Sequence, residues 1–170
     1  MTPEEVKNFN ETRLKAERGD AMAQYDLGAC YSCGKGVYIE TVEAAKWYRK
    51  SAEQGYGWAQ YTLGRCYEEG EGVPKDYVEA VKWYRKGAEQ GTGFAQDKMG
   101  FCYRDGKGVL KDEVEAYAWF NLAAIQIRQV RSTLEMLEEN MSYAQIQAAQ
   151  KRTKELQELI KKNKAAAGTK

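Results

Sequence analysis

The sequence predicts an all-α fold: an α-solenoid of antiparallel helix pairs, formed by three 36-residue repeats with helical caps at both ends. The segments YDLGACY, YTLGRCY and DKMGFCY begin at residues 25, 61 and 97, and EAAKWY, EAVKWY and EAYAWF begin at residues 43, 79 and 115. All matched positions are therefore 36 residues apart. Residues 21–56 and 57–92 share 22 identities in 36 positions, far more than chance gives, which indicates a repeat protein.

The first expected element is an N-terminal capping helix over residues 3–18. Thr2, Pro3 and Glu5 stand at the N-cap, N1 and N3 positions of a helix start. The motif KAERG at residues 15–19 matches SAEQG in the first repeat, at the end of its second helix. The capping helix therefore corresponds to a second helix that stands alone.

Each repeat is expected to contain two helices, and the repeats occupy residues 20–55, 56–91 and 92–127. In the first repeat, apolar residues at helical spacing predict helices over about 21–33 and 40–54. Gly34 ends the first of these, since glycine accepts the positive φ of a helix C-cap. Asp76 and Asp112 are the expected N-caps of the second helices in the later repeats.

Two helices are expected to cap the C-terminal end over residues 128–163. Ile127 replaces the glycine that ends each repeat, so the first capping helix follows directly and runs to about residue 139. Ser142 opens the second one, which carries one apolar stripe: Ile146, Ala149, Thr153, Leu156 and Ile160. The tail, residues 164–170, is expected to be frayed. Residues 1–170 as a whole are expected to form a single solenoid domain.

The repeat pattern, A-x-A-Q-Y-x-L-G-x-x-Y-x-x-G-x-G-V followed by E-A-x-K-W-Y-x-K-x-A-E-Q-G, resembles the Sel-one-like repeat family, a 36-residue relative of tetratricopeptide repeats. The resemblance covers about residues 15–127. The later segment MSYAQIQAAQKR looks like a common C-terminal extension of bacterial members. The resemblance implies a bacterial protein with a tetratricopeptide-like solenoid that is used as an interaction scaffold or adaptor.

Composition excludes several kinds of chemistry. The chain has no histidine, which rules out serine–histidine and cysteine–histidine nucleophiles and every histidine-containing metal site. Its 26 basic and 25 acidic residues nearly cancel, with a net charge of −4 on residues 1–150 and +5 on residues 151–170. We therefore expect no nucleic-acid or membrane partner. No catalytic residue, cofactor or metal is predicted.

The N-terminal sequence and the hydropathy predict a cytoplasmic location. No apolar run reaches the length of about 18 residues that suggests a membrane span. The segment MTPEEVKNFN is polar and lacks the apolar core of a signal peptide. Secretion stays open as an alternative if a leader was trimmed from the start.

The cysteines Cys30 and Cys33 form a C-x-x-C motif, but the repeats favour a packing role. Cys30 recurs as Cys66 and Cys102, in units that lack a second cysteine. Free cysteine behaves as a small buried hydrophobe, so these three are expected to form a ladder in the core. Cys33 is unmatched and is expected at the surface. A redox or metal-binding pair is the alternative.

Two further recurring features have a structural interpretation and a functional alternative. Trp47, Trp83 and Trp119 recur at the same position and are expected to interlock adjacent units, with a stacking platform for bases or sugars as the alternative. The basic residues of the second helices are expected to form a solvated convex face, with a weak site for an acidic partner as the alternative: Lys46, Arg49, Lys50, Lys82, Arg85 and Lys86.

Positions that differ between the repeats are free to serve function. On the first helices they fall at offsets of 3, 4, 7 and 11 residues, which places them on one stripe opposite the packed face. In the tetratricopeptide relatives this stripe lines a concave groove that holds peptides, and the resemblance implies the same here. The expected partner-binding residues are Met22, Tyr25, Trp58, Tyr61, Arg65, Glu68, Phe94, Asp97, Phe101 and Arg104.

The leading hypothesis is a non-enzymatic adaptor, monomeric or weakly self-associating, that binds another protein or a peptide in this groove. Aromatic residues interleaved with arginine are typical of interface hot spots. Three alternatives remain open. The aromatics only pad the inner curve of the solenoid; acidic residues such as Glu68, Glu69 and Asp105 serve a hydrolase; or the helices read RNA one base per unit.

Overall fold

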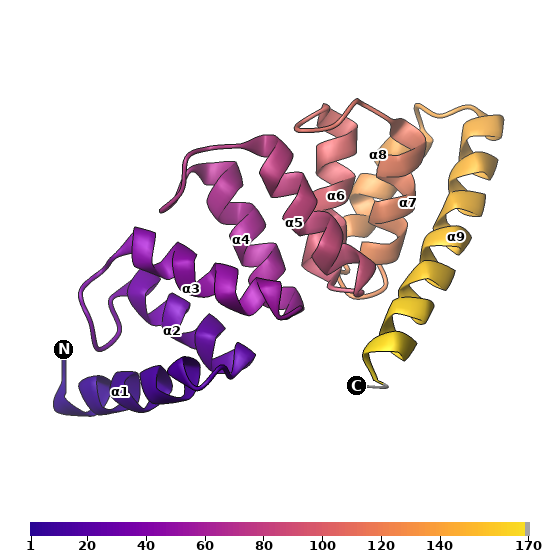
Figure 1. The fold of residues 1–170 in the computed structure, drawn as a ribbon. Helices are drawn as coiled ribbons and strands as arrows, with labels where there is room; N and C mark the ends of the chain where they lie inside the picture. The colour runs from indigo at the N-terminus through magenta and orange to yellow at the C-terminus, as the bar shows by residue number, and fades with distance from the viewer. Residues whose placement is uncertain (169–170) are drawn as a thin grey trace. The chain divides into compact units, whose positions relative to one another are not determined.

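The computed structural model describes residues 1–168, which contain nine helices and no strand (Figure 1). The first seven are the predicted N-terminal capping helix and the three helix pairs of the repeats, and the last two follow the third repeat. Their bounds are α1 Pro3–Glu17, α2 Ala21–Cys33, α3 Thr41–Glu53, α4 Gly57–Glu69, α5 Tyr77–Glu89, α6 Gly93–Asp105, α7 Glu113–Ala123, α8 Val130–Glu138 and α9 Tyr143–Ala167. The predicted all-α class is confirmed.

The helix starts form where the sequence places capping residues. The Glu5 backbone N–H donates to Thr2 Oγ1 at 3.2 Å, and the Thr2 backbone N–H donates to Glu5 Oε2 at 2.6 Å. The carboxylates of Asp76 and Asp112 each accept a hydrogen bond from the backbone N–H three residues later, that of Glu79 and of Glu115, both at 3.0 Å. Each of these contacts satisfies donors that a helix start leaves open.

Paired glycines end the first helices and set their distance from the preceding second helix. Gly34 caps α2 in the left-handed region with φ 73°. Two residues later Gly36 also has a positive φ, and a Cβ there would run into the backbone carbonyl of Glu5 in α1. Gly72 meets the carbonyl of Thr41 in α3 in the same way. Since Glu5 and Thr41 are 36 residues apart, α1 occupies the position of a second helix, as predicted.

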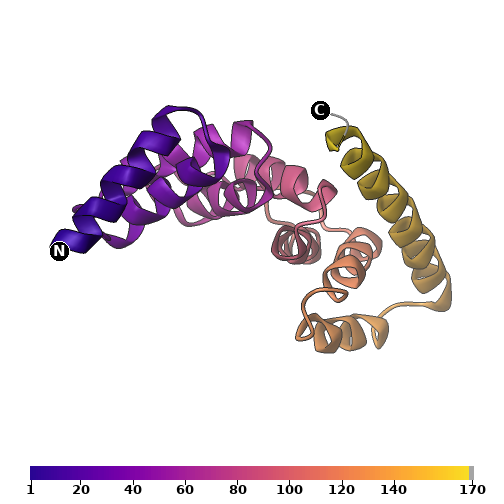
Figure 2. The same ribbon diagram turned by 90° about the horizontal axis from the view of Figure 1, so that it is seen from below.

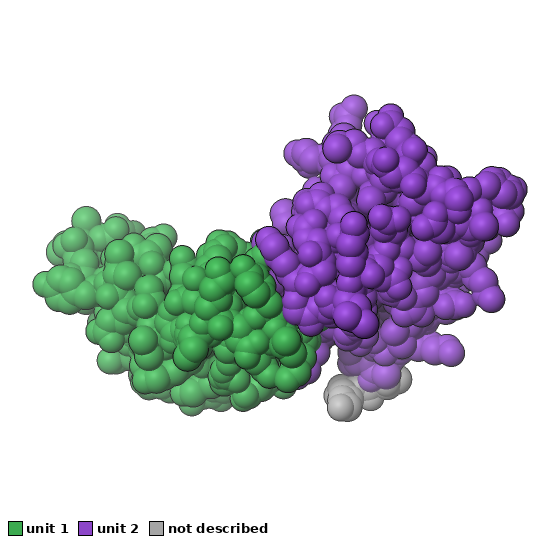
Figure 3. Space-filling view, turned by 90° about the horizontal axis from the view of Figure 1, so that it is seen from above, with its two compact units in different colours: residues 1–83 green, residues 84–170 purple. Residues whose placement is uncertain are grey.

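The chain divides into two compact units, unit 1 (Met1–Trp83) and unit 2 (from Tyr84 onward), coloured separately in Figure 3. Unit 1 contains α1 to α4, which pack successively, α1 on α2, α2 on α3 and α3 on α4. In unit 2, α6 packs on α7, and α7 also contacts α8 and α9. The single domain over residues 1–170 stays a prediction.

Each unit buries the residues that recur between repeats. Leu27 and Leu63 are fully buried in unit 1, as is Met99 at the same position in unit 2. The glycine that follows this position in each repeat makes room for an aromatic ring. A Cβ on Gly28 would lie 2.7 Å from the Tyr48 ring, and one on Gly100 would lie 2.6 Å from the Phe120 ring. These columns therefore build the stack.

The tryptophan column belongs to the cores of the two units. Trp83 and Trp119 are buried, and Trp47 is half-buried against the cluster that contains Phe9 and Leu27. Trp83 and Trp119 are therefore closed to a base or a sugar, as the structural interpretation predicts. The Trp47 ring is partly exposed, with Lys50 Nζ 3.8 Å from its centre.

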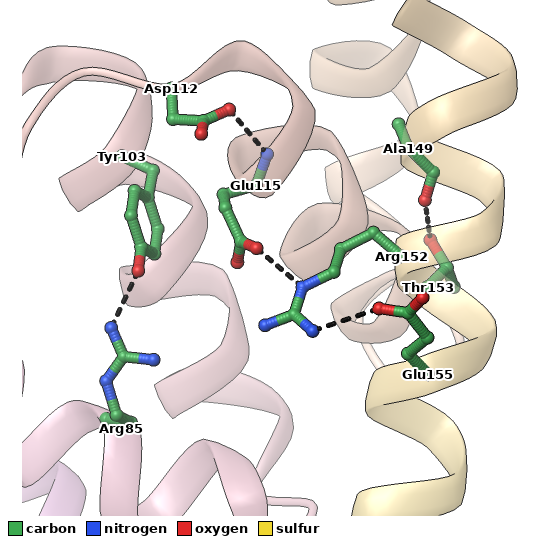
Figure 4. A network of polar contacts seen from close by, with 8 residues as sticks. All are labelled: Arg85, Tyr103, Asp112, Glu115, Ala149, Arg152, Thr153 and Glu155. Carbon is green, nitrogen blue, oxygen red and sulfur yellow. Dashed lines mark hydrogen bonds and ion pairs between the residues drawn. The ribbon is translucent and has the colours of Figure 1, made fainter.

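The long helix α9 closes unit 2 by packing along α7 (Figures 1 and 2). Most of its predicted apolar stripe is buried, namely Ala149, Thr153, Leu156 and Ile160. Arg152 on α9 donates through Nε to the Glu115 carboxylate of α7 at 2.5 Å and through Nη1 to Glu155 at 3.2 Å (Figure 4). Farther along, Asn163 Nδ2 donates to the backbone carbonyl of Glu89 at 3.1 Å. Apolar burial and polar bonds thus fix α9 over most of its length.

The helix α9 ends later than the sequence prediction has it. It runs to Ala167, so residues 164–167 are helical where a frayed tail was expected. The reason is local, because alanine has the highest helix propensity and three alanines follow Lys164. Residues 169–170 of the predicted tail lie outside the residues that the structure describes.

The expectation of a fully solvated basic face on the second helices is wrong for its arginines. Arg85 Nη2 donates to the Tyr103 hydroxyl at 2.7 Å, and its guanidinium lies 5.8 Å from the centre of that ring (Figure 4). Arg49 bonds the Tyr67 hydroxyl in the same manner. Both arginines are half-buried and link a second helix to the first helix of the next repeat. Only the lysines fit the expectation. Lys46, for example, is exposed and forms an ion pair with Glu43 of the same helix.

Candidate functional site

In unit 1, four of the predicted stripe residues come together around one hollow. The hollow has a volume of about 290 Å³ and lies between α2, α3 and α4. Tyr25 contributes from α2, and Trp58, Tyr61 and Arg65 contribute from α4. Trp58 is 44% exposed, while the other three side chains are half-buried. We call this site the aromatic hollow.

The rings around the aromatic hollow lie in different planes. Tyr48 of α3 also lines it, with its ring centre 5.6 Å from that of Tyr25 at an interplanar angle of 45°. Trp58 and Tyr61 make an edge-to-face pair with centres 6.3 Å apart and an angle of 83°. Hydroxyl-bearing side chains complete the lining: Ser32, Thr41 and Thr62. The hollow is therefore both aromatic and polar.

Two charged residues line the aromatic hollow, and their situations differ. Arg65 is held by Glu69, one helical turn along α4, through contacts of 3.0 and 3.1 Å from Nη2 and 3.3 Å from Nε. Glu71 follows the end of α4 and is exposed. Among the described residues, Glu71 has no ion pair within 4 Å. The charge of Arg65 is thus largely neutralised in place, and that of Glu71 is not.

Two other stripe residues of unit 1 are placed differently. Met22 is 58% exposed at the start of α2 and does not line the aromatic hollow. Glu68 is half-buried near the end of α4 and does not line it either. The structure therefore selects four of the six predicted residues of unit 1 as one cluster.

Unit 2 carries the remaining four stripe residues on α6. Phe94 is 44% exposed, but Phe101 packs edge-to-face on Phe120 with ring centres 5.0 Å apart and is half-buried. The Arg104 guanidinium lies 4.6 Å from the centre of the Phe101 ring, and its Nε donates to Asp105 at 2.7 Å. Phe101 thus belongs to the core of unit 2 as well as to the stripe.

Asp97 is the remaining stripe residue of unit 2, and its surroundings disfavour its charge. The side chain is half-buried, and this burial raises the pKa of its carboxyl. The nearby cations Lys98 and Arg104 act in the opposite direction with smaller effect. The Asp97 carboxyl therefore ionises less readily than that of an exposed aspartate.

A second hollow of about 310 Å³ lies one repeat earlier, between α1 and α2. Seven of its nine lining residues stand 36 positions before a lining residue of the aromatic hollow. Thr12 stands where Tyr48 does, Ala29 where Arg65 does, and Lys35 where Glu71 does. The same place in successive repeats is thus hollow in both cases, and only its lining changes.

This correspondence identifies residues that the sequence reasoning missed. Tyr48 and Glu71 line the aromatic hollow but do not belong to the first-helix stripe. A search for differences at matching positions of the turns would have found Glu71, which stands where Lys35 and Lys107 do in the other repeats. Tyr48 recurs as Tyr84 and Phe120 and therefore gave no such signal.

The cysteines are placed as the repeats predict. Cys66 and Cys102 are buried, Cys30 is half-buried and Cys33 is exposed, and all four are free thiols. Burial raises the pKa of Cys66 to about 11, so its thiol is unreactive at neutral pH. Within the described residues, no cluster of cysteine and carboxylate ligands could hold a metal ion. The packing interpretation of the ladder is confirmed.

The fold and its repeat length define the class of the protein as a solenoid of short antiparallel helix pairs. A model of the Sel1 repeat matches residues 21–56, 59–92 and 93–126. These matches cover more than half of the chain, and the protein therefore belongs to the Sel1 repeat family. The resemblance seen in the sequence is confirmed.

Two solved structures are similar in both fold and sequence. One is c5321, a protective antigen present in uropathogenic Escherichia coli strains that displays an SLR fold. It is 34% identical with a TM-score of 0.83, and the match covers 95% of this chain and 35% of that one. The other is a Sel1 repeat protein from Oxalobacter formigenes, 40% identical with a TM-score of 0.69, covering 70% of this chain and 49% of that one. The chain thus spans half or less of each of these proteins.

The family sets the general function. Sel1 repeats generally mediate protein–protein interactions, and proteins built from them are typically non-enzymatic scaffolds. A comparison with curated proteins finds no match. No helix in the described part of the chain is long and apolar enough to cross a membrane.

Proposed function

We propose that this protein is a non-enzymatic adaptor that binds a peptide or a helix of a partner protein along its first-helix stripe, with the aromatic hollow as the anchor. The observation that carries the proposal is the convergence of Tyr25, Trp58, Tyr61 and Arg65 around one hollow. Large aromatic side chains beside arginine make up the residues that dominate the binding energy of protein interfaces. None of the four is fully buried, so a partner can reach them.

The charge pattern supports an adaptor over the hydrolase alternative. Glu69 is engaged by Arg65, and Asp105 is engaged by Arg104. The hydrogen bond from Arg104 lowers the pKa of Asp105, which is the opposite of what a general acid at neutral pH requires. These carboxylates are therefore suited to fixing arginines.

A peptide selection tests the proposal directly. Peptides selected from a random displayed library against the full chain should bind the protein, and Trp58→Ala combined with Arg65→Ala should weaken them at least tenfold. Loss of one hot-spot residue costs about 2 kcal/mol or more, which exceeds a tenfold change in affinity. Phe101 is left intact because its contact with Phe120 makes it part of the core.

A matched control separates the stripe from the general surface. Tyr38→Ala combined with Lys46→Ala also removes one exposed aromatic ring and one cation, but neither residue lines the aromatic hollow. This control should bind the selected peptides as the unchanged protein does, and thermal unfolding should show both double variants folded. Equal binding by all three proteins, or equal loss in both variants, would refute the proposal.

A further inference from the structure

We infer that the aromatic hollow receives a positively charged side chain, a lysine or arginine of the partner or its methylated form. This inference rests on the proposed function, which it makes more specific by naming the chemistry of the anchor. The inference follows from the aromatic rings, the charges and the size of the hollow.

Four aromatic rings line the hollow. They belong to Tyr25, Tyr48, Trp58 and Tyr61. The Tyr25–Tyr48 and Trp58–Tyr61 pairs are inclined at 45° and 83°, so the rings do not form one flat stack. The face of an aromatic ring carries the negative part of its quadrupole and attracts a cation within about 6 Å. Several rings in different planes around one space are the arrangement that recognises ammonium groups.

The charges of the lining favour the same sign of ligand. Arg65 and Glu69 compensate each other through their contacts of 3.0 to 3.3 Å. Glu71 is the other charged residue of the lining, and it is negative. An anionic ligand would have to take Arg65 from Glu69 while facing Glu71 and the ring faces. A cation meets Glu71 and the rings, and the Arg65 charge that it also faces is offset by Glu69.

The wider charge of unit 1 and the size of the hollow agree with this choice. Residues 1–83 contain 14 acidic and 11 basic side chains, a net charge of −3. A volume of about 290 Å³ lies just below the range of about 300–1,000 Å³ that is usual for pockets holding drug-sized ligands. The hollow therefore suits one side chain or head group and not a larger cofactor.

The equivalent hollow between α1 and α2 shows what the lining changes. It is lined by one aromatic ring, that of Phe9, against four in the aromatic hollow, and Thr12 stands at the position of Tyr48. Lys35 stands at the position of Glu71, while Glu5 and Asp26 also line this second hollow. The chain thus contains an internal comparison site of similar volume with fewer rings, which should bind cations more weakly.

Small probe molecules test the inference without a natural partner. The full chain is titrated with choline, with its neutral isostere 3,3-dimethylbutanol, and with the methylamides of Nα-acetyl-lysine, Nα-acetyl-trimethyllysine and Nα-acetyl-glutamate. The reporter is the indole N–H signal of Trp58 in the NMR spectrum, assigned through Trp58→Phe. We expect saturable shifts with the cationic probes and none with the neutral or the anionic ones.

Variants then assign the effect to the hollow. Glu71→Gln should weaken the cationic probes by about fivefold, which is the effect of one close ion pair in water. Glu53→Gln removes an equal charge from an exposed position of α3 outside the hollow and should change nothing. Trp58→Leu keeps apolar bulk but removes a ring and should weaken cations by about two- to fivefold.

Each possible outcome decides the question. Equal shifts with the neutral isostere, binding of the glutamate derivative instead, or the absence of any shift of Trp58 would overturn the cationic assignment. The proposed adaptor function stands or falls separately. Selected peptides that need the stripe but no lysine or arginine would support the adaptor and contradict the cation site, whereas probe binding with no peptide binding would do the reverse.

Discussion

At the scale of single residues, Gly72 shows how backbone crowding fixes the contact between successive repeats. Its φ is 71°, and a Cβ would collide with the carbonyl of Thr41, which is backbone and cannot rotate away. Gly36 stands in the same relation to Glu5. In these two pairs the second glycine is therefore needed for close approach as well as for its dihedral angles.

Gly72→Ala should destabilise the protein clearly more than Gly19→Ala. Gly19 has a φ of 95°, but a Cβ there would meet nothing within 4 Å, so alanine at this position pays only for a left-handed conformation, about 1–2 kcal/mol. Alanine at Gly72 adds the collision with Thr41 and should cost at least about 2 kcal/mol more. Urea unfolding of both variants measures the difference. Equal losses would show that the crowding has no energetic role.

Individual residues also mark the limit of what the sequence could predict. Recurrence every 36 residues correctly indicated the buried cysteine ladder and the exposed Cys33, because repetition separates packing positions from variable ones. The bonds from Arg49 and Arg85 to tyrosines recur with the same spacing but were missed. A periodic pattern shows that a residue is needed without showing which partner it meets across the next helix.

At the scale of elements, the helices follow local rules that the sequence contains. The predicted helix over 21–33 is α2 as observed, and the one over 40–54 differs from α3 by a residue at each end. Capping residues and glycines determine these limits. The late end of α9 was not predictable in this way, since neither a proline nor an early glycine stops it. The hollows also escaped prediction, because they form between elements.

The attachment of α9 to unit 2 can be measured with two leucines of the same helix. Leu156 is 1% exposed and lies in the buried stripe, whereas Leu159 is 38% exposed. Leu156→Ala should lower the free energy of unfolding by about 2–5 kcal/mol, as for other buried leucines, and Leu159→Ala by well under half of that. Chemical denaturation of both variants checks this. A similar loss at both positions would contradict the packing described for α9.

At the scale of the whole molecule, the burial of un-ionised cysteine and tyrosine side chains makes the free energy of unfolding fall at alkaline pH. Burial raises the pKa of Cys66 to about 11 and that of Tyr48 above its ordinary value, and it raises the pKa of Tyr117 to about 12 with help from Glu138. The unfolded chain releases these protons at lower pH than the folded one. Stability is therefore complete below the ordinary cysteine value of 9.0 and is lost as the pH rises beyond it.

The protein should keep a constant stability between pH 6 and 8 and lose stability above pH 9. The flat range follows because the chain has no histidine to titrate there. Near pH 11, Cys66 alone should account for a loss of about 2 kcal/mol, which Cys66→Ala should abolish and Cys33→Ala should not. Urea midpoints across this pH range measure it. A profile of Cys66→Ala that falls as steeply as that of the unchanged protein would contradict the assignment.

The recurrence of a hollow at the same junction of successive repeats bears on how such a protein changes over generations. Tandem duplication of one repeat would copy the crowded glycine that keeps the stacking distance, and with it one more recess. Point substitutions at Thr12 and Tyr48, or at Lys35 and Glu71, show that the lining can diverge while the frame is preserved. Lengthening the array thus enlarges its repertoire of ligand chemistries without redesign of the scaffold.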